Sequence, residues 1–134
     1  MVNDADMVEM LRAAKTIAVV GLSSKRLRPS NGVAAFLQQH GYRIIPVNPA
    51  ETEVLGEKVY ESLANVPIPI DLIDVFRQSE AVPAIVDEAI ALGVKYLWLQ
   101  EGVVHEEAAA KARAAGIKVV MDRCILKEYR RLLG

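Results

Sequence analysis

Short, continuously apolar segments alternate with helical segments along this chain, and no other sequence feature limits its fold as strongly. Residues 16–21 are apolar after the opening threonine and end at a glycine. Such a segment is typical of a strand whose sheet is covered on both faces, because apolar and polar residues then no longer alternate. Similar segments at 43–48, 71–76, 96–99 and 118–121 predict four more strands.

Helical patterns occupy most of the intervals. Apolar residues spaced by three and four predict helices over 4–14, 31–40, 80–92, 106–115 and 125–133. We expect Asp4 to cap the first helix and Ser30 or Asn31 to cap the second, since these side chains accept hydrogen bonds from helix N–H groups.

Two places depart from this rhythm. Segment 51–69 is interrupted by glycine and proline, and it predicts only a short extended piece at 58–60 and a helical turn capped by Ser62. Pro46 lies inside the second predicted strand and has no N–H to donate, which indicates limited ladder bonding on one side of that strand.

This order of elements predicts an α/β fold. Strands that alternate with helices favour a parallel sheet, and right-handed crossovers favour a Rossmann-like, doubly wound, five-stranded sheet with helices on both faces. We expect residues 1–134 to form a single domain, with the N-terminal helix of residues 1–15 packed on it.

The composition excludes several classes of partner. Sixteen basic and seventeen acidic residues give a net charge of −1, so no global positive field draws the chain to nucleic acid or to an anionic membrane. No apolar run approaches the roughly 20 residues of a membrane-spanning helix. The single cysteine and the lack of a signal peptide predict a cytoplasmic protein. The composition does not exclude a protein partner, which the sequence does not identify.

The loop after the first strand carries the main functional prediction. Residues 21–30 combine a glycine, three serines and three basic side chains just before a helix, whose free N–H groups attract anions. We therefore expect this loop to bind phosphates; the alternative is a solvated charged turn. The loop matches neither the G-x-G-x-x-G fingerprint nor the P-loop pattern. Its candidate residues are Gly21, Leu22, Ser23, Ser24, Lys25, Arg26, Arg28 and Ser30.

The end of the second strand narrows the class of ligand. Proteins that bind NAD usually place an acid there to accept hydrogen bonds from the adenosine ribose, whereas this chain has Asn48 and Pro49. A missing carboxylate opposite a cationic loop favours a ribose that carries its own phosphate, as in coenzyme A or NADP. These residues do not separate the two ligands.

Later loops supply further candidates. Phe76 and Arg77 follow the third strand and fit an apolar and cationic wall against adenine or pyrophosphate, although they also fit a core residue followed by an exposed charge. Gly102, after the fourth strand, allows a close backbone approach to a ligand or simply marks a turn.

No catalytic residue is predicted. His40 and His105 stand at helix ends, where capping is the usual role, and Cys124 has no activating histidine near it in the sequence. Asp71 and Asp74 are offset by three in a predicted strand and so face opposite sides of the sheet. Neither a carboxylate dyad nor metal-ligand spacing is indicated.

Several ordered motifs carry a resemblance to a known family. The segments AVVGLSSK, VNP, DVFR, WLQ with Gly102, and VMDRC resemble the small bacterial and archaeal CoA-binding domain proteins. They are similar, more distantly, to the CoA-binding N-terminal domain of the succinyl-CoA synthetase α subunit. The resemblance implies CoA on the loop 21–30, Asn48 and Pro49 near its adenosine end, and Phe76, Arg77 and Gly102 in the same cleft.

The resemblance also implies a limit on activity. In the synthetase a separate downstream domain carries the phosphorylated histidine, and this chain ends at Gly134 without such a domain. We expect a protein that binds CoA or acyl-CoA without chemistry of its own, as a carrier, sensor or partner module. The alternative is an NADP-dependent oxidoreductase or another NAD(P)-binding protein.

Overall fold

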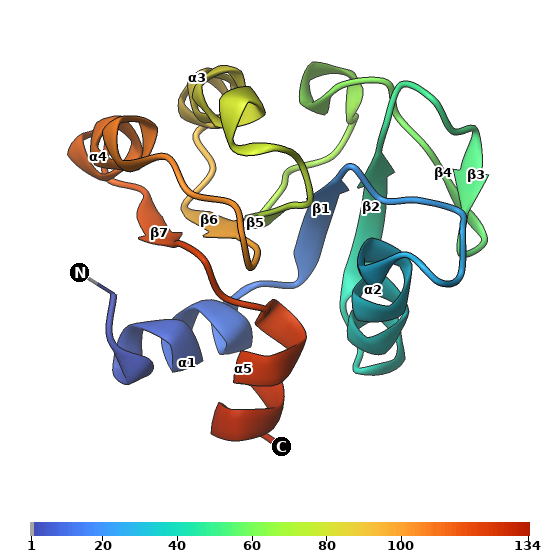
Figure 1. Cartoon of the computed structure of the whole chain (residues 1–134), viewed down its shortest axis with the longest axis horizontal. Coiled ribbons are helices and arrows are strands. Elements are labelled where there is room, and N and C mark those ends of the chain that lie inside the picture. Colours follow the sequence, from blue (N-terminus) through green and yellow to red (C-terminus); the bar gives the residue numbers. More distant parts are fainter. Residues whose placement is uncertain (1) are drawn as a thin grey trace.

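Five parallel strands form the central sheet of the computed structural model, which describes residues 2–134 (Figure 1). Their spatial order is β2-β1-β5-β6-β7, so the order reverses between β1 and β5. The predicted Rossmann-like, doubly wound sheet is therefore confirmed. The strands are β1 (Thr16–Val20), β2 (Arg43–Val47), β5 (Leu72–Val75), β6 (Tyr96–Leu99) and β7 (Lys118–Val120).

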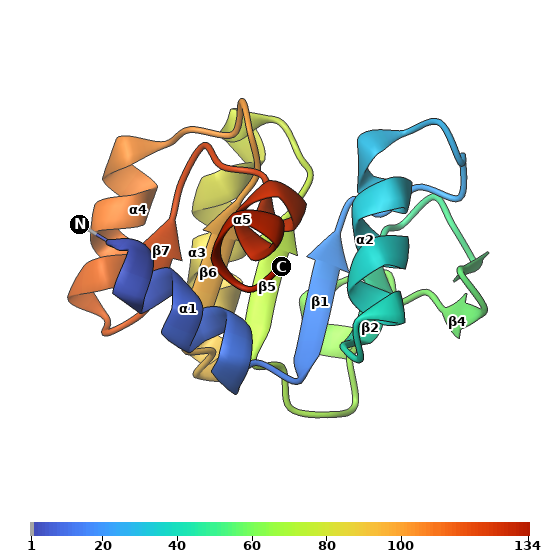
Figure 2. The ribbon, with the colours of Figure 1, turned by 90° about the horizontal axis from the view of Figure 1, so that it is seen from below.

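Helices cover both faces of the sheet. In Figures 1 and 2, α1, α2 and α5 lie on one face, and α3 and α4 lie on the other. None of the helices within residues 2–134 has the length and apolar character needed to cross a membrane. Their bounds are α1 (Asp4–Ala13), α2 (Pro29–Gln39), α3 (Val82–Leu92), α4 (Glu106–Ala114) and α5 (Ile125–Leu132).

Strand β1 explains why the sequence shows no alternation of apolar and polar residues. Ile17 and Val19 belong to the apolar cluster beneath α1, α2 and α5, whereas Ala18 and Val20 belong to the cluster beneath α3 and α4. Successive side chains of a strand point to opposite faces, and here both faces are covered. The four buried positions after Thr16 are therefore all apolar.

The start of α1 differs from the sequence prediction by one residue. Asn3, not Asp4, caps the helix: its Oδ1 accepts the Asp6 N–H at 2.9 Å, and the Asp6 carboxylate accepts the Asn3 N–H at 3.1 Å. This reciprocal pair is a capping box. Asp4 is left free to bind Arg131 of α5.

The edge of the sheet agrees with the prediction made from Pro46. Strand β2 is an edge strand, and Pro46 pairs with Val19 on its inner side. On the outer side the chain bonds only locally, where the Tyr60 N–H donates to the Pro46 carbonyl at 3.0 Å and the Asn48 N–H donates to the Tyr60 carbonyl at 2.9 Å.

The irregular segment contains a hairpin that the sequence does not predict. Strands β3 (Glu53–Val54) and β4 (Glu57–Lys58) pair antiparallel outside the main sheet. The predicted helical turn is η1 (Leu63–Asn65), but the Ser62 hydroxyl donates to the Asn65 side chain at 2.6 Å rather than capping backbone N–H groups. A second such turn, η2 (Ser79–Ala81), precedes α3.

The two acids of the third predicted strand have separate environments. Asp71 lies just before β5, and its carboxylate accepts the N–H groups of Lys15 and Thr16, each at 2.9 Å. Asp74 lies inside β5 between Val19 and Trp98 and is fully buried. Neither of its carboxylate oxygens has a hydrogen-bond partner within residues 2–134. Burial raises the pKa of Asp74 well above its ordinary value of 3.8.

Asp74→Asn should change how stability depends on pH. A carboxyl whose folded pKa is raised keeps its proton in the folded state, whereas the unfolded chain releases it above about pH 4. The free energy of unfolding of the natural protein should then fall by up to about 1.4 kcal/mol per pH unit, from about pH 4 until the folded pKa is reached. The variant should lack this slope in urea unfolding curves measured across that range.

The control for this measurement is Asp87→Asn, which alters an exposed aspartate of α3. It should leave the slope above about pH 5 unchanged. An identical slope in the Asp74→Asn variant and the natural protein would show that Asp74 does not hold a proton in the folded state.

Candidate functional site

A cleft of about 1160 Å³ opens at the carboxyl ends of β1, β2, β5 and β6. This is the place where doubly wound sheets bind ligands, because the chain leaves β1 and β5 toward opposite faces. Most of the residues predicted from the sequence line it. They are Gly21, Ser23, Lys25, Arg28, Ser30, Asn48, Phe76, Arg77 and Gly102.

The other predicted residues lie outside the wall of the cleft. Leu22 is fully buried and belongs to the apolar cluster under α2. Ser24, Arg26 and Pro49 are exposed and are not among the lining residues. A contribution of Leu22 to ligand binding is thus limited to its backbone and to the packing of the loop.

The start of α2 corrects the predicted cap. Arg28 occupies the N-cap position without a side-chain cap bond, and Pro29 is the first helical residue. Proline suits this position because the N–H that it lacks would have no partner within the helix. Ser30 instead accepts the Ser23 N–H at 3.1 Å, and the Asn31 amide donates to the Ser23 carbonyl at 2.9 Å. Both side chains therefore fix the loop.

Gly21 brings the ends of β1 and β5 into close contact. Its φ angle is +87°, and a Cβ added there would overlap the Phe76 carbonyl oxygen and lie 3.0 Å from Cδ of Arg77. Only glycine satisfies both conditions without strain. The Gly21 N–H donates to the Val47 carbonyl at 2.8 Å, which ties this turn to β2 as well.

Three basic side chains line the cleft without an ion pair to a carboxylate of the described residues. Lys25, Arg28 and Arg77 line it, and within residues 2–134 none of them forms an ion pair. Glu101 also lines the cleft, but Lys127 binds it at 3.0 Å. The unpaired cations are available to an anionic ligand.

Asn48 holds neighbouring backbone in place. Its Nδ2 donates to the Leu22 carbonyl at 3.1 Å, and its Oδ1 accepts the Ala50 N–H at 2.9 Å. Both ends of the amide are used within the protein. Asn48 thus joins the loop after β1 to the loop after β2 and shapes the wall between them.

The sequence prediction of the site does not include three acidic residues that line the cleft, Glu51, Glu80 and Glu101. Glu51 lines it, and its Oε2 accepts the Ser24 N–H at 2.7 Å. The acid that is absent at Asn48 is therefore supplied three residues later. Pro49 is a weak sequence signal for the position of Glu51, since proline favours a turn that brings the following residues back toward the strand end.

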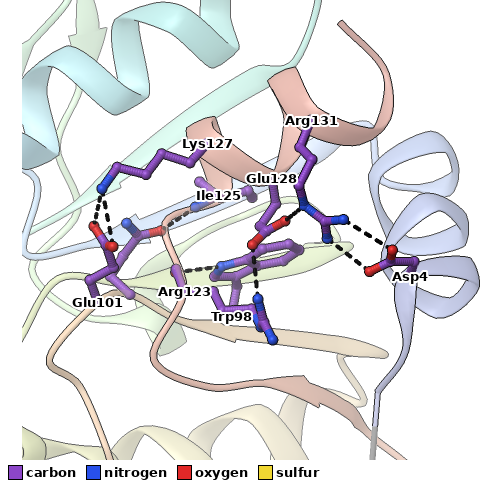
Figure 3. A network of polar contacts seen from close by, with 9 residues as sticks. Asp4, Trp98, Glu101, Arg123, Ile125, Lys127, Glu128 and Arg131 are labelled. Carbon is purple, nitrogen blue, oxygen red and sulfur yellow. Dashed lines mark hydrogen bonds and ion pairs between the residues drawn. The ribbon is translucent and has the colours of Figure 1, made fainter.

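The wall beside β6 is fixed by contacts to the turn before α5. The Trp98 Nε1–H donates to the Arg123 carbonyl at 2.9 Å, and the Gln100 Oε1 accepts the Ile125 N–H at 3.1 Å (Figure 3). Asp122 has a φ angle of +61°, and its carboxylate accepts the Gly102 N–H at 2.8 Å. The predicted ligand residue Gly102 is held by this turn.

Charged side chains attach α5 to this wall and to α1. The Glu128 carboxylate accepts from Arg123 Nη1 at 3.1 Å and from Arg131 Nε at 2.7 Å, while the Arg131 Nη atoms bind both oxygens of Asp4 at 2.8 and 3.0 Å (Figure 3). Glu128 is largely buried, and its two ion pairs with Arg123 and Arg131 offset the loss of solvent around its carboxylate. The network connects the N-terminal helix to the side of the cleft.

The histidines lie at helix ends, as the sequence predicts. Nδ1 of His40 lies 2.7 Å from the Phe36 carbonyl at the end of α2, and Nδ1 of His105 accepts the Ala108 N–H at 3.1 Å at the start of α4. Neither lines the cleft. Cys124 does line it, as a buried free thiol. No cluster of His, Cys, Asp or Glu suited to a metal occurs within residues 2–134.

A second cavity, of about 450 Å³, lies at the opposite edge of the sheet. Lys15 and Tyr42, which precede β1 and β2, belong to its lining. It contains none of the residues predicted to bind ligand, and it faces the amino ends of the strands. The fold and the candidate residues together favour the larger cleft.

Comparison with known proteins assigns the family. A model of the CoA binding domain matches residues 15–130, which cover the whole sheet and all of the cleft loops. The chain belongs to the CoA binding domain family. The resemblance inferred from the sequence motifs is confirmed.

Some relatives of this chain have about the same length as it, and others are much longer. The uncharacterized protein YneT of Bacillus subtilis is 43% identical over 123 residues, which are 92% of this chain and 91% of YneT. A hypothetical protein from Pyrococcus horikoshii has a solved structure with a TM-score of 0.96 and 41% identity, covering 99% of this chain and 94% of the other.

A third relative is an enzyme of which this chain matches only a part. The ADP-forming acetate–CoA ligase I of Archaeoglobus fulgidus is 26% identical over 128 residues. The match covers 88% of this chain but 19% of the ligase.

Gly21→Ala tests the close contact between Gly21 and the Phe76 carbonyl at the base of the cleft. The methyl group would meet the Phe76 carbonyl, and the positive φ would add about 1–2 kcal/mol of strain. We expect the free energy of unfolding in urea to fall by at least that amount. Gly32→Ala is the matched control, because a Cβ at this helical position meets nothing within 4 Å. It should raise stability by about 0.5–1 kcal/mol. Equal stability of the Gly21→Ala variant and the natural protein would contradict the close contact.

Proposed function

We propose that the cleft binds coenzyme A or acyl-CoA and that the protein acts as a carrier, sensor or partner module without chemistry of its own. One observation carries this proposal. Three cations without ion pairs, Lys25, Arg28 and Arg77, surround the turn at Gly21, where the strand order reverses between β1 and β5. The chain's membership of the CoA binding domain family supports the choice of ligand.

The loop 21–30 is the proposed site of the pyrophosphate. The amino end of α2 reaches the cleft through Pro29 and Ser30. Pro29 has no N–H, and the Asn31 N–H donates to the Arg28 carbonyl at 3.1 Å, so the Ser30 N–H is the donor that this end offers to an anion. Lys25 and Arg28 add side-chain charge on the same side. Hydrogen bonds from such donors to phosphate oxygens are short and strong, because the acceptor is ionised.

The opposite wall suits the remaining parts of the nucleotide. Phe76 is half-buried and offers an apolar surface, and Arg77 beside it is exposed and free of carboxylates. An arginine can stack on a base or bind a phosphate through its planar fork. A volume of about 1160 Å³ exceeds that of most drug-sized sites, as an extended nucleotide requires.

Several features support a binding role over catalysis. His40 and His105 lie outside the cleft, and their Nδ1 atoms are occupied by helix backbone. The chain corresponds to 19% of the length of the Archaeoglobus ligase, so the ligase reaction is not carried over to it. We place this function in the cytoplasm, in keeping with the single free cysteine.

Ligand-induced stabilisation gives the first test. Binding to the folded state alone raises the midpoint of thermal unfolding in proportion to the logarithm of ligand concentration. We expect CoA to raise it strongly, and NADP and NAD to raise it little. Calorimetric titration should give one CoA per chain. If CoA at millimolar concentration gave neither a thermal shift nor heat, and NADP gave both, a dinucleotide-binding function would replace this proposal.

Charge removal in the loop gives the second test. Lys25→Ala combined with Arg28→Ala should weaken CoA binding roughly tenfold or more, because two charge-assisted contacts to phosphate are lost. Arg26→Ala is a matched control, since Arg26 lies in the same loop outside the cleft wall. Dephospho-CoA should lose less affinity than CoA if either cation contacts the 3′-phosphate. Equal losses for the double variant and the control would contradict the proposed phosphate site.

A further inference from the structure

Three consecutive backbone N–H groups of the loop after β1, at Ser23, Ser24 and Lys25, already have acceptors. The Ser23 N–H donates to the Ser30 hydroxyl and the Lys25 N–H donates to the Ser23 hydroxyl, each at 3.1 Å. The Ser24 N–H donates to the Glu51 carboxylate at 2.7 Å. Of these three acceptors, two are hydroxyl groups and one, at Ser24, is a carboxylate. Only the carboxylate has negatively charged oxygens like those of a phosphate.

Glu51 is brought to this position by a turn of the chain. The Glu51 N–H lies 3.4 Å from the Asn48 carbonyl, and the Asn48 side chain binds Ala50 and Leu22, which keeps the turn against the loop after β1. Glu51 is half-buried and lines the cleft beside Lys25. Its position is therefore set by backbone and amide contacts of the site itself.

Glu51 is charged at neutral pH in this setting. Hydrogen bonding by the Ser24 N–H and then by the Ser24 side chain, with a smaller effect of the Lys25 charge, holds the pKa of its carboxyl below the ordinary value. The carboxylate forms no ion pair, because no basic side chain within residues 2–134 lies in ion-pair range of it. A negatively charged ligand that approaches the loop meets this carboxylate at the Ser24 amide.

We propose that Glu51 is an internal competitor of the ligand: its carboxylate occupies the anion position at the Ser24 N–H, and a ligand phosphate binds there by displacing it. This inference rests on the proposed phosphate site of the cleft. Glu51 would lower the affinity for every phosphate-bearing ligand and so make binding depend on several phosphates acting together. Ligands with a single phosphate would be rejected more strongly than CoA, which carries three.

The competing role of Glu51 is to hold the ligand. An acid near the end of the second strand of a dinucleotide-binding fold commonly accepts hydrogen bonds from ribose hydroxyls. In that case the removal of Glu51 would weaken binding, whereas removal of a competitor strengthens it. The sign of the change in affinity separates the two roles.

The ligand-free protein tests the contact directly. In the natural protein, the amide chemical shift of Ser24 in ¹H–¹⁵N NMR spectra should follow protonation of the Glu51 carboxyl as the pH is lowered. The shift should lose this dependence in Glu51→Gln and keep it in Glu53→Gln, an exposed residue of β3 outside the cleft. An unresponsive Ser24 amide in the natural protein would overturn the proposal.

Binding measurements then test the competition, with inorganic pyrophosphate and CoA as probes. Glu51→Gln keeps the shape of the side chain and removes its charge, and it should bind both probes about fivefold to tenfold more tightly than the natural protein. Glu51→Ala, which removes the acceptor as well, should do so at least as strongly. Glu53→Gln should stay within about twofold of the natural protein.

Each other outcome has a defined meaning. Weaker or unchanged binding of pyrophosphate by both Glu51 variants would overturn the competitor role. An equal gain in Glu53→Gln would also overturn it, because the effect would then come from net charge alone. Tighter pyrophosphate binding by Glu51→Gln without any CoA binding would leave this inference standing and remove CoA as the proposed ligand.

Discussion

The contact between Gly21 and the Phe76 carbonyl determines the shape of the cleft. Parallel strands β1 and β5 are neighbours, and beyond them the chain turns to α2 on one face and toward α3 on the other. Without a side chain at Gly21, the two strand ends can approach until backbone meets backbone. The loops that diverge from this point form the walls, and both receive cations. A larger residue here would fill the base of the site and separate the strands.

The sheet could be predicted from the sequence because its signal is local and repeated. Each of the five strands consists mostly of apolar residues, and helices alternate with them in a regular order. The caps could not be assigned with the same accuracy, since Asn3 and Asp4 are both good capping residues and only the geometry of the first turn selects Asn3. Similarly, Ser30 is of a residue type that often caps helices, yet its hydroxyl accepts the Ser23 N–H instead.

The candidate site shows the same division between local and distant information. The residues of the loop after β1 could be grouped from sequence because they are contiguous and precede a helix. Glu51 could not, since its role depends on how the Asn48 amide folds one loop against another. Asp74 is a different case: its place in a central strand was predicted, but the lack of any hydrogen-bond partner is a property of the packed core.

The carboxylate of Glu51 alters the meaning of the missing acid at the end of β2. Asn48 leaves that position neutral, and this alone favours a ligand with an extra phosphate on its ribose. Glu51 then adds a negative charge on the same side of the cleft, at the amide where a phosphate would bind. The two effects are compatible if selectivity comes from the total charge of the ligand. Under the proposed function, a ligand with several phosphates would gain contacts with Lys25, Arg28 and Arg77 that outweigh the loss of one internal hydrogen bond, whereas a ligand with one phosphate would gain too few.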